Sequence, residues 1–234
     1  NLTKRYPVLY CQDGQTLFDN QLARSLADFV PHEWRLDETL NGLINQGNCA
    51  EVIVVGVEAR DHSGARQWDY TPWLDPNPLG QGPEGGGVWD YLKFLVETVK
   101  PSIDREHRTI EHDNGILGAS LGGLAAFVAG RIRPETFSKI GCISTSWWWS
   151  HESILKAVDI SDAHYPQKLY LDCGTAGELE NNNNSRMRRL SWLLEQDGYV
   201  EGRDLRTWTF EGAAHNPHDW SERLDQPLKF LYPW

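Results

Sequence analysis

Short runs of apolar residues recur along the chain and predict about six β-strands. In five of them large apolar and β-branched residues follow one another without alternation, which is typical of strands buried on both faces of a parallel sheet. The sixth run, residues 205–210, alternates apolar and polar positions as an edge strand does. The five continuous runs are residues 7–11, 52–57, 115–117, 140–143 and 169–171.

Two helical stripes lie between these strands. One follows residues 34–44, and a cleaner one, with apolar residues at i, i+3, i+4 and i+7, follows residues 88–99 and should end at Pro101. Strands that alternate with helices of this length imply right-handed crossovers. The predicted fold class is therefore α/β, with a mostly parallel central sheet covered by helices on both faces, in a single domain over residues 1–234.

One segment breaks this alternation. Residues 59–87 are rich in Gly, Pro and Trp, show no helical period, and exceed the usual length of a connection without structure. Such a segment usually covers a site, so we expect this one to lie over the functional residues.

Composition narrows the classes of partner. The net charge of −11 disfavours a nucleic-acid backbone or an anionic membrane as the binding partner. No apolar run approaches the ~20 residues of a membrane-spanning helix. The four cysteines are widely spaced and lack the paired spacing of zinc sites, so no zinc site is expected from them. The localisation stays open.

The strongest chemical signal is Gly118-Ala119-Ser120-Leu121-Gly122. This Gly-x-Ser-x-Gly pattern follows a predicted strand and precedes a helical run, which is the setting of a nucleophile elbow. Glycine on either side allows the strand and helix backbones to approach closely. We therefore predict that Ser120 is a nucleophile.

A serine nucleophile needs a base. In α/β proteins that carry their serine on such an elbow, the order along the chain is Ser, acid, His. His215 fits that order, because it follows the last predicted strand in a loop of small residues. His218 is the rival, and its spacing from His215 beside Asp219 is also compatible with a metal pair. The hydrolase order favours His215 as general base.

The acid should follow the strand that ends near Asp172, where it can orient the imidazole. The next segment, residues 174–180, offers Glu178 and Glu180, and Glu178 is the predicted acid. Glu180, Asp172 and a dyad without any acid remain the alternatives.

An oxyanion hole needs two backbone amides aimed at the developing negative charge. The first should be that of Leu121, and the second should come from the turn after the first strand, where Gln15 is the predicted donor and Gly14 lets the backbone approach.

The substrate is less constrained. Trp147 and Trp148 follow the strand after the elbow helix, so they could form an apolar or sugar-stacking wall, or pack the core instead. Arg66, in the 59–87 segment, could reach a negatively charged group of the substrate, or lie on the surface like most arginines.

Five segments together resemble the Putative esterase family, which includes feruloyl and acetylxylan esterases, esterase D-like enzymes, enterochelin esterases and mycolyltransferases. They are YPVLYCQDGQ (6–15), DYTPW (69–73), PSID (101–104), GASLGGL (118–124) and EGAAHN (211–216). The resemblance covers nearly the whole chain and implies an α/β-hydrolase domain with a Ser, His and usually acidic triad and no metal or organic cofactor. Family members tend to place the acid directly after Gly-Thr-x, where this chain has Gly177. The chain also starts at what corresponds to the third strand of the full fold, so the first strands are missing or supplied from elsewhere.

The sequence thus predicts a serine hydrolase that cleaves a carboxylic ester of a small molecule or a saccharide through an acyl-enzyme. Acyl transfer to another alcohol would use the same residues, and a ligand-binding domain without catalysis is the third class. The oligomeric state is not predicted.

Overall fold

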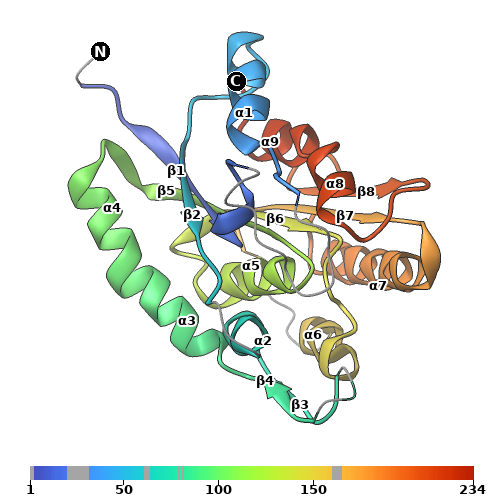
Figure 1. The fold of residues 1–234 in the computed structure, drawn as a ribbon. Helices are drawn as coiled ribbons and strands as arrows, with labels where there is room; N and C mark the ends of the chain where they lie inside the picture. The colour runs from blue at the N-terminus through green and yellow to red at the C-terminus, as the bar shows by residue number, and fades with distance from the viewer. Residues whose placement is uncertain (1–2, 20–31, 61–63, 79, 81, 160–164) are drawn as a thin grey trace.

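A parallel six-stranded sheet forms the centre of the computed structural model, which describes residues 3–19, 32–60, 64–78, 80, 82–159 and 165–234 (Figure 1). The strands lie in the order β2-β1-β5-β6-β7-β8, and every neighbouring pair is parallel. Their bounds are β1 Tyr6–Gln12, β2 Ile53–Val57, β5 Thr109–Ala119, β6 Phe137–Ile143, β7 Lys168–Gly174 and β8 Leu205–Phe210. Each predicted run forms one of these strands, which confirms the predicted α/β class.

Helices cover both faces of the sheet (Figure 1). On one face α5, α7 and the α3–α4 helix pack into a core with the apolar side chains of β1, β5, β6 and β7. On the other face α1, α8 and α9 enclose a second core, in which the rings of Trp34 and Trp220 meet edge to face. The helices are α1 Leu36–Asn45, α2 Ala65–Tyr70, α3 Val88–Phe94, α4 Lys100–Glu106, α5 Leu121–Ile132, α6 Trp149–Asp159, α7 Gly177–Gln196, α8 Pro217–Ser221 and α9 Asp225–Leu231.

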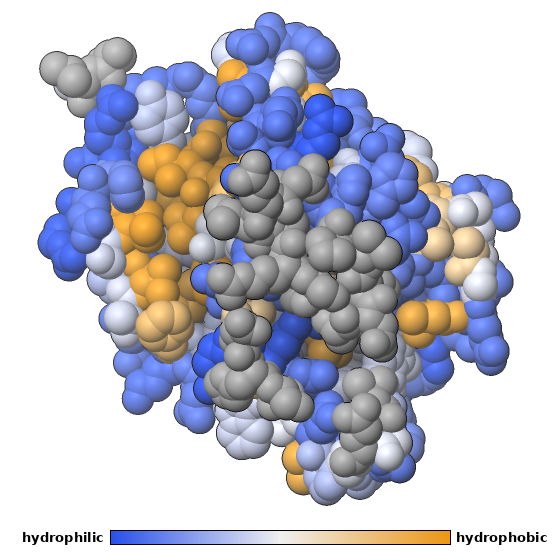
Figure 2. All heavy atoms as spheres, viewed as in Figure 1, coloured by the Kyte–Doolittle hydropathy of each residue, from blue (hydrophilic) through white to orange (hydrophobic). Residues whose placement is uncertain are grey.

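The position of β2 differs from the expectation of burial on both faces. Among the described residues β2 pairs only with β1 and forms one edge of the sheet, so Ile53, Val54 and Val55 are half-buried and Gly56 is exposed. Figure 2 shows the resulting concentration of apolar atoms over β2 and between β2 and α4. A run of apolar residues does not encode which strands pair with it, so its composition could not reveal an edge position. The other edge is β8, as its alternation predicted.

Pro101 does not end the helix that precedes it. The chain continues through a π-helical turn, η2 (Leu95–Val99), directly into α4. Proline lacks an N–H and its ring clashes with the carbonyl four residues earlier in a regular α-helix. The wider π-turn accommodates Pro101 as the second residue of α4, so one long helix crosses this face of the sheet.

The 59–87 segment holds more structure than its lack of period suggested. Within its described residues, which exclude 61–63, 79 and 81, it contains α2 and an antiparallel pair, β3 (Leu74–Asp75) with β4 (Glu84–Gly85). A helix of six residues is too short for its period to stand out in a sequence. Of the helices in the described part of the chain, none combines the length and apolarity needed to cross a bilayer.

Candidate active site

Ser120 occupies the sharp turn between β5 and α5. Its backbone has φ 57° and ψ −123°, a strained conformation for a residue with a side chain. The turn depends on glycine, because a Cβ added at Gly118 would lie 2.5 Å from the backbone of Gly122. The turn presents the Ser120 side chain at the carboxyl end of the sheet, where it is 8% exposed.

His215 lies in the loop between β8 and α8, and its Nε2 is 3.0 Å from Oγ of Ser120. Two backbone amides, of Thr175 and Ala176, donate to the carbonyl of Ala213 and attach this loop to the start of α7. The ring of Trp220 meets the imidazole edge to face, with centroids 5.1 Å apart. The contacts of Ala213 and the ring of Trp220 therefore hold the imidazole in place, with its Nε2 facing Ser120.

The partner of His215 on its far side is Glu180. Nδ1 of the imidazole and Oε1 of Glu180 form a short hydrogen bond, and the Glu180 side chain is fully buried. Glu178, the acid predicted from sequence, is exposed in the same first turn of α7. Residues two apart on a helix point about 200° away from one another, so only one of the two can face the sheet. The structure thus brings Ser120, His215 and Glu180 together and leaves Glu178 outside.

The surroundings of Glu180 favour its ionised form. Burial by itself raises the pKa of a carboxyl group, but hydrogen bonds from His215, Cys173 and the Gly174 amide, together with the charge of the imidazole, lower the pKa of Glu180 to about 2. Glu180 therefore carries a negative charge at neutral pH, as stabilisation of an imidazolium requires.

The turn after β1 lies against the elbow, as the predicted oxyanion hole requires. A Cβ at Gly122 would be 3.2 Å from the carboxylate of Asp13. Leu121 is the first residue of α5, so its amide has no acceptor within that helix. Gln15 lies in the 3₁₀ turn η1 (Gly14–Thr16), and its side chain accepts a hydrogen bond from the Ala59 amide at 3.1 Å.

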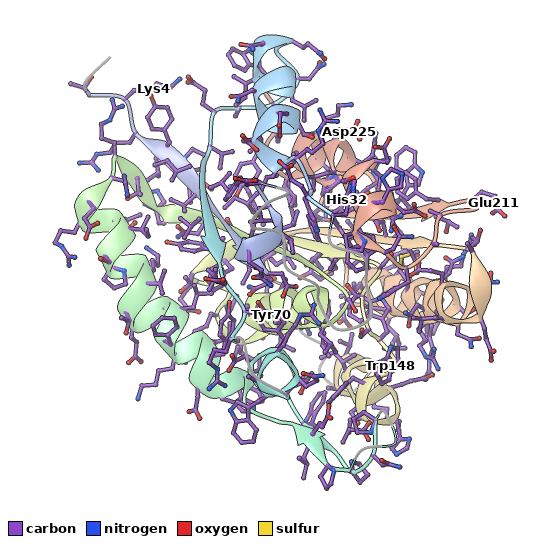
Figure 3. The ribbon with its side chains drawn as sticks, viewed as in Figure 1. Lys4, His32, Tyr70, Trp148, Glu211 and Asp225 are labelled. Atoms are coloured by element: carbon purple, nitrogen blue, oxygen red, sulfur yellow. The ribbon has the colours of Figure 1, made fainter. Side chains whose placement is uncertain are left out.

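An ion pair holds this turn in place. Asp13 has a left-handed backbone with φ 56°, and its carboxylate receives two hydrogen bonds from the guanidinium of Arg66, at 2.7 and 2.8 Å. The hydroxyl of Tyr70, which lies on α2 (Figure 3), accepts from the Asp13 amide at 3.0 Å. The 59–87 segment therefore supports the predicted oxyanion turn.

The three residues predicted to contact the substrate differ in their exposure and contacts. The guanidinium of Arg66 pairs with Asp13 through Nε and Nη2, and its side chain is partly exposed. Trp147 is fully buried and packs edge to face on Phe127 in the core. Trp148, immediately before α6 (Figure 3), is partly exposed, so Trp148 and Arg66 are the two of the three that a substrate could contact.

Sequence analysis missed the polar residues after β6. Oγ of Ser146 is 3.2 Å from Oγ of Ser120, and its amide donates to the Ser120 carbonyl at 3.1 Å. Ser144 contacts Glu180 from the same loop. The signal was a polar run, Ser144-Thr145-Ser146, immediately after a buried strand at the active edge of the sheet.

The alternative metal pair is not assembled. His215 is directed at Ser120 and Glu180, whereas the ring of His218 packs on His32, with centroids 4.9 Å apart. Asp219 accepts from the Ala214 amide. Within the described ranges, the side chains close enough to share an ion are those of Glu33, Asp37 and Glu38. This cluster is acidic and mostly exposed, and such clusters are common without a metal.

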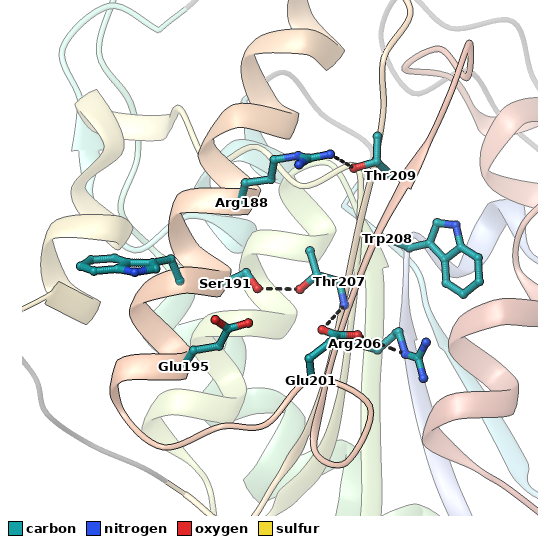
Figure 4. Close-up of a pocket in the computed structure, with 9 residues that line it drawn as sticks. Arg188, Ser191, Glu195, Glu201, Arg206, Thr207, Trp208 and Thr209 are labelled. Carbon is teal, nitrogen blue, oxygen red and sulfur yellow. Dashed lines mark hydrogen bonds and ion pairs between the residues drawn. The ribbon is translucent and has the colours of Figure 1, made fainter.

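One cavity lies away from the Ser120 site, between α7 and the edge strand β8 (Figure 4). It measures about 600 Å³, and most of its polar groups already have partners. Ser191 bonds Thr207 at 2.8 Å, and the carboxylate of Glu201 accepts from the Thr207 amide at 3.0 Å. The paired hydroxyls and carboxylate leave the cavity without the Ser–His–Glu arrangement seen at Ser120.

Known proteins resemble this chain along most of its length. The chain matches the Putative esterase family over residues 1–231. It is 29% identical to the ferri-bacillibactin esterase BesA of Bacillus subtilis, over 82% of this chain and 68% of BesA. It is 25% identical to the uncharacterized protein YbbA of the same organism, over 97% of this chain and 86% of YbbA.

Solved structures share the fold. The BES protein from Bacillus cereus superposes with a TM-score of 0.70 at 21% identity, over 98% of this chain and 84% of that protein. The enterobactin esterase FES from Shigella flexneri gives a TM-score of 0.71 at 19% identity, over 98% of this chain and 53% of FES. Together, the match along almost the entire sequence and the shared fold show that the chain belongs to the Putative esterase family, carboxylic ester hydrolases of the α/β-hydrolase fold.

Proposed function

We propose that this protein hydrolyses a carboxylic ester through an acyl-enzyme on Ser120, with His215 as the general base and Glu180 as the acid. The observation that carries the proposal is the alignment of the three side chains. Nε2 of His215 lies 3.0 Å from Oγ of Ser120, while Nδ1 is hydrogen-bonded to a buried carboxylate. This is the arrangement in which an imidazole can take the serine proton and remain in the required tautomer.

The reaction has two steps. Oγ of Ser120 attacks the ester carbonyl as its proton passes to Nε2 of His215, and the imidazolium then gives that proton to the departing alcohol. In the second step a water molecule gives its proton to His215 and attacks the acyl-enzyme; the bond to Ser120 Oγ then breaks, the imidazolium returns the proton to Oγ, and the acid is released. In both steps the negative charge on the carbonyl oxygen would be stabilised by the amides of Leu121 and Gln15.

Labelling of the nucleophile provides the direct test. A fluorophosphonate probe should modify Ser120, as mapped by peptide mass spectrometry, and Ser120→Ala should lose both the label and at least ~10⁴-fold of the esterase activity. Retention of more than a tenth of the activity in Ser120→Ala would refute the assignment.

The same assay can define the substrate. Ferri-bacillibactin, enterobactin and ferulate esters are the first substrates to compare, because similar proteins are named for them. Each reaction is run with and without an added alcohol. A new ester formed from that alcohol would assign acyl transfer in place of hydrolysis, since both reactions share the acyl-enzyme.

A further inference from the structure

The carboxylate of Glu180 uses its two oxygens differently. Oε1 faces His215, whereas Oε2 accepts from the Gly174 amide at 2.5 Å, the Cys173 thiol at 3.0 Å and the Ser144 hydroxyl at 3.1 Å. Three donors on one oxygen fix the rotation of the carboxylate. The other oxygen is thereby directed at Nδ1 of His215.

Of these donors, the Cys173 thiol and the Ser144 hydroxyl can rotate, and the thiol also lies 3.6 Å from the Glu180 carbonyl oxygen. A hydroxyl has one proton and can rotate to donate elsewhere. Here Nη2 of Arg223 donates to Oγ of Ser144 at 2.5 Å, and a guanidinium cannot accept a hydrogen bond. Because Ser144 must accept from Arg223, its proton is directed to Glu180. The chain of hydrogen bonds therefore has a fixed direction, from Arg223 through Ser144 to Glu180.

Ser144 is also held in a costly backbone conformation. Its φ is 41°, in the left-handed region that a residue with a Cβ rarely adopts, and its side chain is fully buried. Its amide donates to the Asp172 carbonyl at 2.9 Å and to the Asp172 carboxylate at 3.3 Å. Glycine would adopt this backbone conformation with less strain. The presence of serine at this position therefore points to a use for its hydroxyl.

Arg223 is a buried residue whose guanidinium also donates to the Asp219 carbonyl at 3.3 Å. Its side chain is 3% exposed, between α8 and α9, where it pairs with the fully buried Asp172 and lies over the ring of Phe210. Nε and Nη2 of Arg223 lie 3.2 and 3.1 Å from Oδ1 of Asp172. The ionisable groups facing Glu180 are thus His215 and Cys173 directly, and Arg223 with Asp172 through Ser144.

We propose that Ser144 and Arg223 are positioning residues that set the orientation of Glu180 and so hold His215 in its working tautomer. The inference rests on the proposed function, because the orientation matters for catalysis only if Glu180 is the acid. Neither side chain needs to touch the substrate, and both act through Glu180.

The test variant is Ser144→Gly, which removes the hydroxyl and relieves the backbone strain at the same time. The variant should remain folded, as checked by thermal unfolding, whereas kcat/KM for an ester should fall roughly 10- to 100-fold with little change in KM, by analogy with the loss of outer hydrogen-bond partners of metal ligands. The matched control is Ser191→Ala, which removes another buried hydroxyl, bonded to Thr207 and distant from the triad in the hydrogen-bond network. This control should retain its kcat.

A double-mutant cycle separates positioning from general damage. If Ser144 acts through Glu180, Ser144→Gly should cost little further activity in a Glu180→Gln background. Additive losses in the cycle would overturn the inference. Full activity of Ser144→Gly alone would overturn it as well.

A measurement on the resting protein keeps this inference distinguishable from the proposed function. The downfield proton NMR signal of the His215 Nδ1–H, assigned by its loss in His215→Ala, should shift upfield or broaden in Ser144→Gly and stay in place in Ser191→Ala. An unchanged signal in Ser144→Gly refutes positioning even if the enzyme is active. Absence of esterase activity in the wild type refutes the function without affecting this signal.

A second variant tests Arg223. Because removal of Arg223 alone would leave the buried Asp172 unpaired, Arg223→Met is combined with Asp172→Asn. The double variant should show the same loss of kcat and the same NMR change as Ser144→Gly. A folded double variant with wild-type kcat and an unchanged NMR signal would show that Arg223 does not position Glu180.

Discussion

Glu180→Gln is the most informative single change in this site, because the amide keeps the shape of the carboxylate but can no longer accept at both ends. The pocket at Oε2 presents donors from Gly174, Cys173 and Ser144, so it favours the amide oxygen in that position. The amide NH₂ then faces Nδ1 of His215 and donates to it. An imidazole that accepts at Nδ1 carries its proton on Nε2, and such an imidazole cannot take the proton of Ser120.

The magnitude follows from this reversal. The variant loses the negative charge that stabilises the imidazolium, and it also stabilises the wrong tautomer. We expect kcat/KM to fall about 10³- to 10⁴-fold, which corresponds to roughly 4–5 kcal/mol of transition-state stabilisation. Substrate binding should change little, because Glu180 is fully buried and does not line a surface.

The assay is steady-state hydrolysis of an activated ester, with Glu178→Gln as the matched control. Glu178 lies in the same turn of α7 but is exposed, so its variant should retain wild-type kcat/KM. Activity above a tenth of wild type in Glu180→Gln would mean that the protein works as a Ser–His dyad. An equal loss in both variants would indicate a general effect on α7 and contradict the reasoning.

Three further predictions concern the surroundings of the triad. Arg66→Met should leave the buried Asp13 carboxylate unpaired, lower stability by about 3–5 kcal/mol in urea unfolding and reduce kcat; unchanged unfolding and kcat would show that the pair does not hold the turn. Gly14→Ala should lower kcat or prevent folding, because its Cβ would lie 2.6 Å from the carbonyl carbon of Gly56, and a fully active, stable variant would contradict the close approach. Since the pKa of Glu180 is depressed to about 2, its ionisation stabilises the fold above pH ~4.5, and this contribution, up to about 3 kcal/mol, is lost as pH falls towards 2. The stability difference between wild type and Glu180→Gln, measured by thermal unfolding across this range, should therefore shrink with acidification.

The turn at Ser120 and the position of His215 beside it could be predicted from sequence because their signals are local. Gly-x-Ser-x-Gly between a strand and a helix specifies the turn that exposes Ser120, whatever the rest of the chain does. His215 follows the last strand in a loop of small residues, and parallel strands end at a common edge of the sheet. The structure brings the two together at 3.0 Å across 95 positions of sequence.

The carboxylate partner of His215 was harder to predict, because Glu178 and Glu180 have the same chemistry and lie two positions apart. The choice depends on where α7 begins and how it is rotated, and the contacts of Thr175 and Ala176 with Ala213 set that start. A shift of one residue would have turned a different side chain towards the sheet. Sequence reasoning included Glu180 among the alternatives but could not decide the rotation of the helix.

The sequence by itself determined the six strands of the central sheet, the α/β class, the family resemblance and the Ser120 turn, because each of these is encoded in neighbouring residues or in their period. The tertiary structure alone decided that β2 is an edge, that Arg66 pairs with Asp13, and that Ser144 and Arg223 reach Glu180. These contacts join residues between 36 and 79 positions apart in the Ser144 network, and no local pattern records them. They exist because buried polar groups must find hydrogen-bond partners, and only the packed chain determines which partners are within reach.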